Sequence, residues 1–154
     1  MKWHQPSFWL RREALAGIGM NTESHYAFDH EMATRYLRRH PRVRYLSDVL
    51  AYFRYHDTSK TVSQGAGFRR EQVDLFRRLQ RDPEFAALVP QLDRAARAVE
   101  WLAQVDRLLD DRARPRLERF RELVTGVLQD RDARCTRNTR RSARRILRYG
   151  GRKR

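Results

Sequence analysis

The chain has 154 residues, about the length of one domain, with 40% hydrophobic residues, 34% charged residues and a formal net charge of +15. No run of about 18 apolar residues is present, which excludes a membrane-spanning helix, and the single cysteine, Cys135, excludes an internal disulfide and a thiolate metal cluster. The positive charge favours an anionic partner, and nucleic acid, anionic lipid and nucleotide phosphates all remain candidates.

The first third of the chain mixes extended and helical patterns. The segment 3–10 is aromatic-rich and interrupted by a proline, which predicts an edge strand or an extended segment, and residues 11–16 predict a short helix. A longer helix is expected to begin at Phe28, where apolar side chains recur every four residues, and to stop before Pro41. Residues 43–55 are rich in β-branched and aromatic side chains and predict one or two further strands.

Beyond a polar loop the pattern becomes helical. One helix is predicted around residues 68–79, and a short one lies between Pro83 and Pro90. An amphipathic stripe with spacings of 4, 3, 3 and 4 residues follows, formed by Ala95, Val99, Leu102, Val105 and Leu109. Another amphipathic helix begins after Pro115, so we expect a helical hairpin or small bundle.

The last segment, residues 131–154, is dominated by arginine and has few apolar residues. This composition predicts a tail that is flexible or marginally helical. Three roles stay open for it. A solvated extension is the default, and contact with anionic lipid comes next, because Ile146, Leu147 and Tyr149 lie among the arginines. Nucleic-acid binding is the third.

Three segments, in this order, resemble parts of a known family. They are residues 5–12 (QPSFWLRR), residues 25–35 (HYAFDHEMATR) and residues 50–61 (LAYFRYHDTSKT). Together they are similar to the second half of bacterial family 2 glycosyltransferases of the GT-A type. The resemblance spans roughly residues 3–63, and the remainder of the chain has no part in it.

This resemblance implies an α+β fold. Residues 1–64 would be the C-terminal part of a glycosyltransferase catalytic domain, residues 65–130 a helical region, and residues 131–154 the arginine-rich tail. The implied reaction is transfer of a sugar, with inversion, from a nucleotide-sugar to a hydroxyl of a carbohydrate or lipid-linked acceptor. The family's nucleotide-binding half has no counterpart in the sequence. Asp130-Arg131-Asp132 has the letters of the family's Asp-x-Asp metal motif but lies beside the arginine-rich tail, so we expect the chain to be inactive alone.

The residues that the resemblance assigns to the site are Asp29, Glu31, Arg35, His56, Ser59, Lys60 and Thr61. Asp29 matches the catalytic base and Glu31 the second acidic residue of the same motif. Arg35 and the four loop residues would contact the donor diphosphate. His56 would also be an accessory ligand for the Mn²⁺ or Mg²⁺ ion that, in the complete enzyme, neutralises charge on the leaving diphosphate.

The residues themselves also allow structural roles. Asp29 stands at the start of the predicted helix, where aspartate is a favoured N-cap. Glu31 and Arg35 have the i,i+4 spacing of a helical ion pair. His56 lies in a polar loop, where an exposed histidine with no ligand is the ordinary case.

Two other classes of function compete with the enzyme. One is a small basic helical protein that binds nucleic acid or an anionic membrane, and the other is an interaction module that docks its helical hairpin on a partner. Nucleic acid is disfavoured here, because the arginines spread over nearly the whole chain and no helix-turn-helix, zinc-finger or ribonucleoprotein signature occurs. The lone cysteine and the lack of a signal-peptide core predict a cytoplasmic location, peripheral at the inner face of the membrane if the tail contacts lipid.

Overall fold

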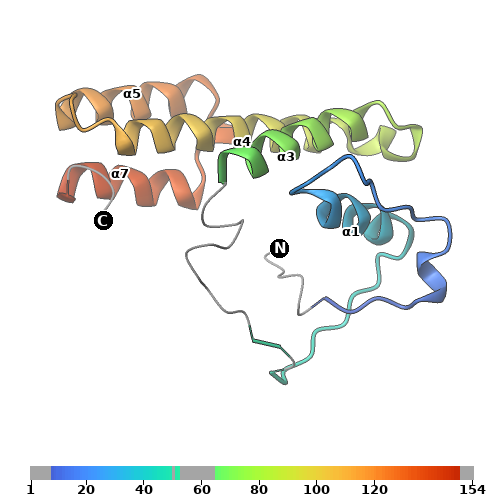
Figure 1. Ribbon diagram of the computed structural model, residues 1–154. Coiled ribbons are helices and arrows are strands. Elements are labelled where there is room, and N and C mark those ends of the chain that lie inside the picture. The colour runs from blue at the N-terminus through green and yellow to red at the C-terminus, as the bar shows by residue number, and fades with distance from the viewer. Residues whose placement is uncertain (1–7, 50, 53–64, 150–154) are drawn as a thin grey trace. The chain divides into compact units, whose positions relative to one another are not determined.

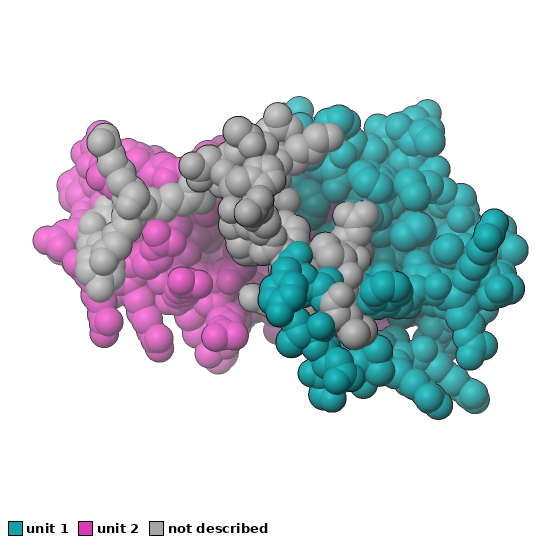
Figure 2. All heavy atoms as spheres, turned by 60° about the horizontal axis from the view of Figure 1, so that its bottom comes forward, with its two compact units in different colours: residues 1–71 teal, residues 72–154 magenta. Residues whose placement is uncertain are grey.

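Every regular element in the described part of the chain is a helix. The computed structural model describes residues 8–49, 51–52 and 65–149. The chain divides into two compact units, Met1–Glu71 and Gln72–Arg154 (Figure 2). The boundary between them lies inside one helix, Gly65–Gln80. The elements in chain order (Figure 1) are η2 (Glu13–Leu15), α1 (Phe28–Arg39), α3 (Gly65–Gln80), η3 (Pro83–Leu88), α4 (Val89–Asp110), α5 (Arg116–Gln129), α6 (Arg131–Arg134) and α7 (Arg137–Tyr149).

The prediction of an α+β fold is wrong, and so is the resemblance to a GT-A glycosyltransferase that implied it. The described residues contain no strand. Within the two segments predicted as strands, residues 8–10, 43–49 and 51–52 have irregular backbone, and the rest of both segments lies outside the described residues. Aromatic and β-branched residues favour an extended backbone, but a stable strand also needs a neighbouring strand to pair with its N–H and C=O groups.

In unit 1, α1 confirms the helix predicted from apolar spacing, and it ends before Pro41. Its charges suit the helix dipole, since Asp29 and Glu31 lie in the first turn and Arg38 and Arg39 in the last. These charges favour the helix at both ends, where its backbone groups have no intrahelical partners.

Glu71 of α3 connects the start of α1 to α3 within unit 1. Its carboxylate accepts hydrogen bonds from the backbone N–H groups of His25 at 3.0 Å, Tyr26 at 2.6 Å and Ala27 at 2.9 Å. These three residues lead directly into α1. The contact therefore fixes the entry to the helix from a residue more than forty positions away in the sequence.

The larger core of unit 2 lies where α4 packs against α5 and α7 (Figure 1). Its buried side chains are Trp101, Val105, Leu108, Leu109, Leu123 and Ile146. The predicted amphipathic helix is thus confirmed as α4, but its buried face is rotated from the predicted stripe. Val99 and Leu102 are half-buried, whereas Trp101 and Leu108 enter the core.

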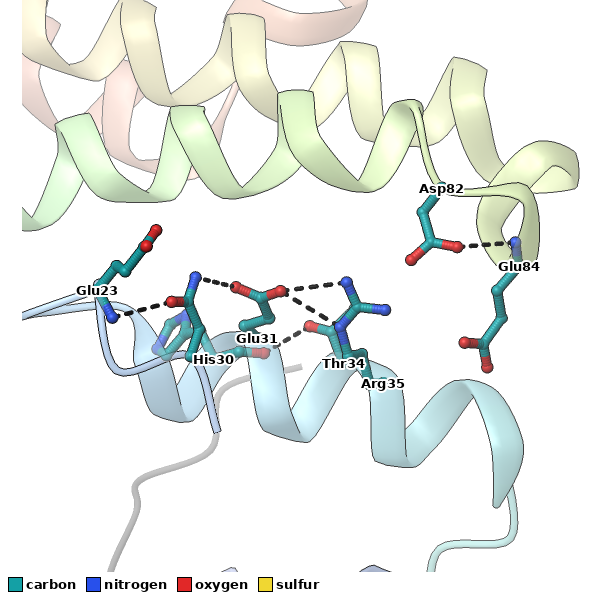
Figure 3. Close-up of polar contacts among 8 residues, drawn as sticks. Glu23, His30, Glu31, Thr34, Arg35, Asp82 and Glu84 are labelled. Carbon is teal, nitrogen blue, oxygen red and sulfur yellow. Dashed lines mark hydrogen bonds and ion pairs between the residues drawn. The ribbon is translucent and has the colours of Figure 1, made fainter. Parts of the chain in front are cut away.

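A smaller core joins the end of α3, η3 and the start of α4. It consists of Leu75, Leu79, Phe85 and Leu92. The start of η3 is fixed locally, because the Asp82 carboxylate accepts the backbone N–H of Glu84 at 3.0 Å and Pro83 occupies the first helical turn. Figure 3 shows this Asp82–Glu84 contact.

Helical structure continues through the arginine-rich segment. Where the sequence predicted a flexible or marginally helical tail, the structure has α6 and α7. Ile146 of α7 is fully buried in the larger core, and Ala143 packs against the same cluster. As far as Tyr149, this segment is therefore part of the fold of unit 2.

Candidate functional site

The predicted site residues fall into two groups. Those on α1 are described, whereas the remaining ones, His56, Ser59, Lys60 and Thr61, lie outside the described residues. Their assignment to a donor site depended on the glycosyltransferase resemblance, which the helical fold contradicts. The structure shows the geometry of Asp29, Glu31 and Arg35 on α1.

Asp29 is half-buried in the first turn of α1. Its Oδ1 accepts the backbone N–H of the adjacent His30 at 2.8 Å. The N-cap position itself is occupied by Ala27, which has no side-chain acceptor. Asp29 therefore acts on the helix dipole from within the first turn rather than as the N-cap residue.

Glu31 is buried, with 6% of its surface exposed, and both of its carboxylate oxygens accept hydrogen bonds. Oε2 accepts the side-chain amide of Asn21 at 3.1 Å. Oε1 accepts Nε and Nη2 of Arg35, each at 3.2 Å, and Figure 3 shows the guanidinium facing the carboxylate. The predicted i,i+4 ion pair is therefore confirmed. Glu31 also attaches α1 to the preceding loop, which contains Asn21.

The described part of the chain shows neither a metal cluster nor a membrane-spanning helix. No three His, Cys, Asp or Glu side chains there gather closely enough to hold a metal ion. No helix among the same residues has both the length and the apolar character needed to cross a membrane. The divalent metal and the cytoplasmic location stay predictions from the sequence.

The C-terminal helix α7 presents a dense positive surface. Six of its 13 residues are arginine and none is acidic. We call these the arginine face: Arg137, Arg140, Arg141, Arg144, Arg145 and Arg148. At 3.6 residues per turn they lie on the side of the helix opposite to Thr139, Ser142 and Ile146, which are all buried. From first to last the arginines span about 16 Å of helix axis, at about 1.5 Å per residue.

The charges of the arginine face are not compensated within the described residues, where no carboxylate pairs with any of them. Nor does the sequence contain an acidic residue after Asp132. Other arginines of unit 2 do form ion pairs, among them Arg77–Glu100, Arg97–Asp93, Arg97–Asp130, Arg114–Asp111 and Arg114–Glu122. The contrast makes α7 a local concentration of unpaired positive charge.

A hydrogen-bonded network fixes the start of α7 against α4. The indole N–H of Trp101 donates to Oγ1 of Thr139 at 3.1 Å, and this hydroxyl donates to the carbonyl of Arg134 at 2.7 Å. Thr136 precedes the helix, and its Oγ1 accepts the backbone N–H of Thr139 at 3.1 Å, as an N-cap does. The arginine face is therefore presented by an anchored helix.

The apolar side of α7 is already occupied. Ile146 is completely buried, and the partly buried Ala143 packs on the same core. Among the described side chains of α7, the exposed apolar one is Leu147, at 44%. An interfacial membrane helix inserts its apolar face into lipid, but here that face is used to hold the fold together.

The sequence indicated a flexible or marginally helical segment rather than a packed helix at α7, because the buried positions of α7 are mostly small and polar. Thr139, Ser142 and Ile146 follow a helical spacing, and arginine is excluded from each. That exclusion is the signal that was available. Only one of the three is a large hydrophobic residue, so an apolar stripe could not reveal the pattern.

No protein-family model matches the chain, and neither a curated protein nor a solved structure is similar enough to count as a match. The exposed, uncompensated cations on an anchored helix are therefore the basis for a proposed function.

Proposed function

We propose that this protein binds nucleic acid through the phosphate backbone, with the arginine face of α7 as the main contact. The observation that supports the proposal is the row of six arginines on one helix side, without acidic partners in the described residues. Guanidinium groups match phosphate oxygens with two parallel hydrogen bonds, which an ammonium group cannot do. Of the 34 basic residues in the chain only three are lysine, which suits this chemistry.

The burial of the apolar side favours nucleic acid over an anionic membrane. Basic amphipathic helices bind membranes by combining attraction to headgroups with insertion of an apolar face. With Ile146 in the core, α7 retains the electrostatic part and lacks most of the insertion part. A phosphate polymer needs only the electrostatic part, because binding is driven by release of condensed counterions.

The salt dependence of binding tests this proposal. Fluorescence anisotropy would follow a labelled duplex of about 20 base pairs between about 50 and 200 mM salt. In the variant Arg141→Gln/Arg144→Gln, two phosphate contacts are lost, so the slope of log K against log salt should shrink by about 2. The matched control is Arg94→Gln/Arg107→Gln, which removes the same charge from exposed positions on α4 and should leave the slope nearly unchanged.

Two results would contradict the proposal. Equal losses in both double variants would mean that the overall charge, and not the arginine face, attracts the duplex. Tight binding to vesicles of phosphatidylserine and phosphatidylcholine, with no measurable binding to the duplex, would identify the membrane surface as the partner instead.

A further inference from the structure

Unit 1 contains a groove with a different chemistry. Its volume is about 1200 Å³, and we call it the N-terminal groove. Its principal lining residues are Trp9, Arg11, Tyr36, Arg39, Arg42 and Arg44. The residues that line the groove include four arginines and one carboxylate, Glu13. Small-molecule pockets are typically about 300–1000 Å³, so this groove has room for a segment of an extended polymer.

The aromatic side chains of the groove differ in how they are held. Trp9 is 71% exposed, which leaves most of a large apolar ring in contact with water. Tyr36 is half-buried, and its hydroxyl oxygen accepts the backbone N–H of Arg11 at 3.4 Å. The Tyr36 ring also lies against His40, with 5.0 Å between ring centroids. Trp9 is therefore the ring that remains available for stacking by a planar ligand.

The arginines of the groove include both anchored and uncompensated groups. Nη1 of Arg39 donates to the carbonyl of Gly17 at 3.0 Å, which holds that side chain over the loop after η2. Arg42 and Arg44 are exposed and form no ion pair with any carboxylate in the described part of unit 1. Together they supply cations for anionic groups on the same ligand that stacks on Trp9.

We propose that the N-terminal groove binds single-stranded nucleic acid, with a base stacked on Trp9 and phosphates paired with Arg42 and Arg44. The inference rests on the proposed function, because it names the form of nucleic acid that the protein prefers at this site. A cationic groove with exposed aromatic rings is the arrangement that captures unpaired strands. Duplex bases are stacked on one another and present their edges, so a duplex offers no free base face to Trp9.

Substitution of Trp9 tests the stacking. A labelled oligothymidine of about 20 nucleotides and a duplex of equal length are titrated in parallel with the full chain. Trp9→Ala should weaken binding to the single strand about tenfold and leave duplex binding unchanged, whereas Trp9→Phe should retain most of the affinity. The matched control is Tyr52→Ala, which removes an aromatic ring that is 90% exposed in the same unit but does not line the groove.

Substitution of the arginines tests the phosphate contacts. Arg42→Gln/Arg44→Gln should reduce the salt slope for the single strand by about 1.4, since each phosphate contact contributes about 0.7. Arg12→Gln/Arg70→Gln removes the same charge from exposed positions of unit 1 outside the groove, and its slope should match that of the wild type. Thermal melting of each variant checks that the fold is retained.

The two proposals fail in different ways. Equal losses of affinity for Trp9→Ala and Tyr52→Ala would overturn the proposal that the N-terminal groove binds single strands. Equal losses of affinity for the single strand and the duplex would overturn it as well. In that case duplex binding that still depends on Arg141 and Arg144 leaves the arginine face intact. Conversely, α7 variants that bind the duplex as tightly as the wild type does would contradict the proposed function. A loss of single-strand affinity confined to Trp9→Ala would then still support binding in the N-terminal groove.

Discussion

Glu71 of α3 holds the entry to α1 within unit 1. Three backbone donors, from His25, Tyr26 and Ala27, converge on its carboxylate. Desolvation raises the pKa of Glu71, but the three backbone hydrogen bonds outweigh it and lower the pKa below its ordinary value. An ionised carboxylate is therefore the form that the folded unit prefers.

Replacing Glu71 with glutamine should lower the free energy of unfolding by about 1–2 kcal/mol, because charge-assisted hydrogen bonds become neutral ones and one acceptor oxygen is lost. Urea unfolding measures the change. Asp74→Asn is the control, since it removes the same charge from an exposed position on the same helix. An equal loss of stability in both variants would show that the backbone contacts of Glu71 contribute nothing beyond charge.

The pH dependence of stability follows from His30 and Glu71. Burial lowers the pKa of His30, and the nearby Asp29 carboxylate offsets this only in part. A lowered histidine pKa favours the neutral ring in the folded state. The stability that the neutral His30 ring contributes is therefore fully present above the pKa of about 6.5 that histidine has in the unfolded chain. This stability is lost as the pH falls through the lower pKa of His30 in the folded protein. Glu71 adds a further loss below its unfolded pKa of about 4.3.

We therefore expect wild-type stability to decrease between about pH 7 and pH 5, where histidine titrates. His30→Gln removes the titrating ring, so its melting temperature should change less over this interval. The ring also packs edge-on against Phe68, at 5.2 Å between centroids, so the variant will be less stable at every pH. The relevant quantity is the slope, and parallel curves for the two proteins would rule out His30 as the source.

Local contacts within one helix could be predicted from the sequence, and contacts between distant residues could not. The Glu31–Arg35 pair follows from i,i+4 spacing alone. Asn21, whose side-chain amide also donates to Glu31, comes from a loop whose path no local sequence pattern determines. The role of Glu71 could not be predicted from the sequence either, because the backbone N–H groups that donate to its carboxylate lie more than forty residues away.

At the scale of elements, the contact between α4 and α5 depends on Gly126. A Cβ atom at this position would lie 2.3 Å from Cη2 and 2.5 Å from Cζ3 of Trp101. That ring is buried and is held by its hydrogen bond to Thr139, so it has little freedom to move. The guanidinium of Arg134 covers the ring, 5.1 Å from its centroid, and donates to the Gly126 carbonyl.

Gly126→Ala should therefore destabilise unit 2 by about 1–3 kcal/mol through overpacking. At an ordinary glycine inside a helix, replacement by alanine changes the stability in the opposite direction and stabilises the protein by about 0.5–1 kcal/mol. Gly65→Ala in α3 is the control, because its methyl group meets no atom within 4 Å. Differential scanning calorimetry measures both variants, and stabilisation by Gly126→Ala would contradict the observed packing.

Element prediction succeeded where one helix face carries large apolar residues and failed where it does not. α4 has several such residues, and its helical period was evident in the sequence. α7 has a single buried isoleucine, and its helix became clear only from the packing against α4 and α5. The residues predicted as strands have high β-propensity, but the described residues offer them no neighbouring strand.

At the scale of the whole molecule, a net charge of +15 would attract any polyanion to some degree. What distinguishes the arginine face is that its charge is concentrated and unpaired, whereas Arg97 and Arg114 are compensated by carboxylates. A measurement of affinity alone cannot separate these two sources of attraction. The location of the bound duplex on the protein separates them.

Nuclear magnetic resonance of the arginine side-chain Nε–H groups tests that location most directly. A short duplex is titrated into the labelled protein at about 0.15 M ionic strength, where screening suppresses long-range attraction. The resonances of Arg141, Arg144 and Arg148 should shift in proportion to the bound fraction, while those of Arg94 and Arg107 on α4 stay in place. Shifts spread evenly over all the arginines, or confined to residues outside α7, would contradict binding through the arginine face.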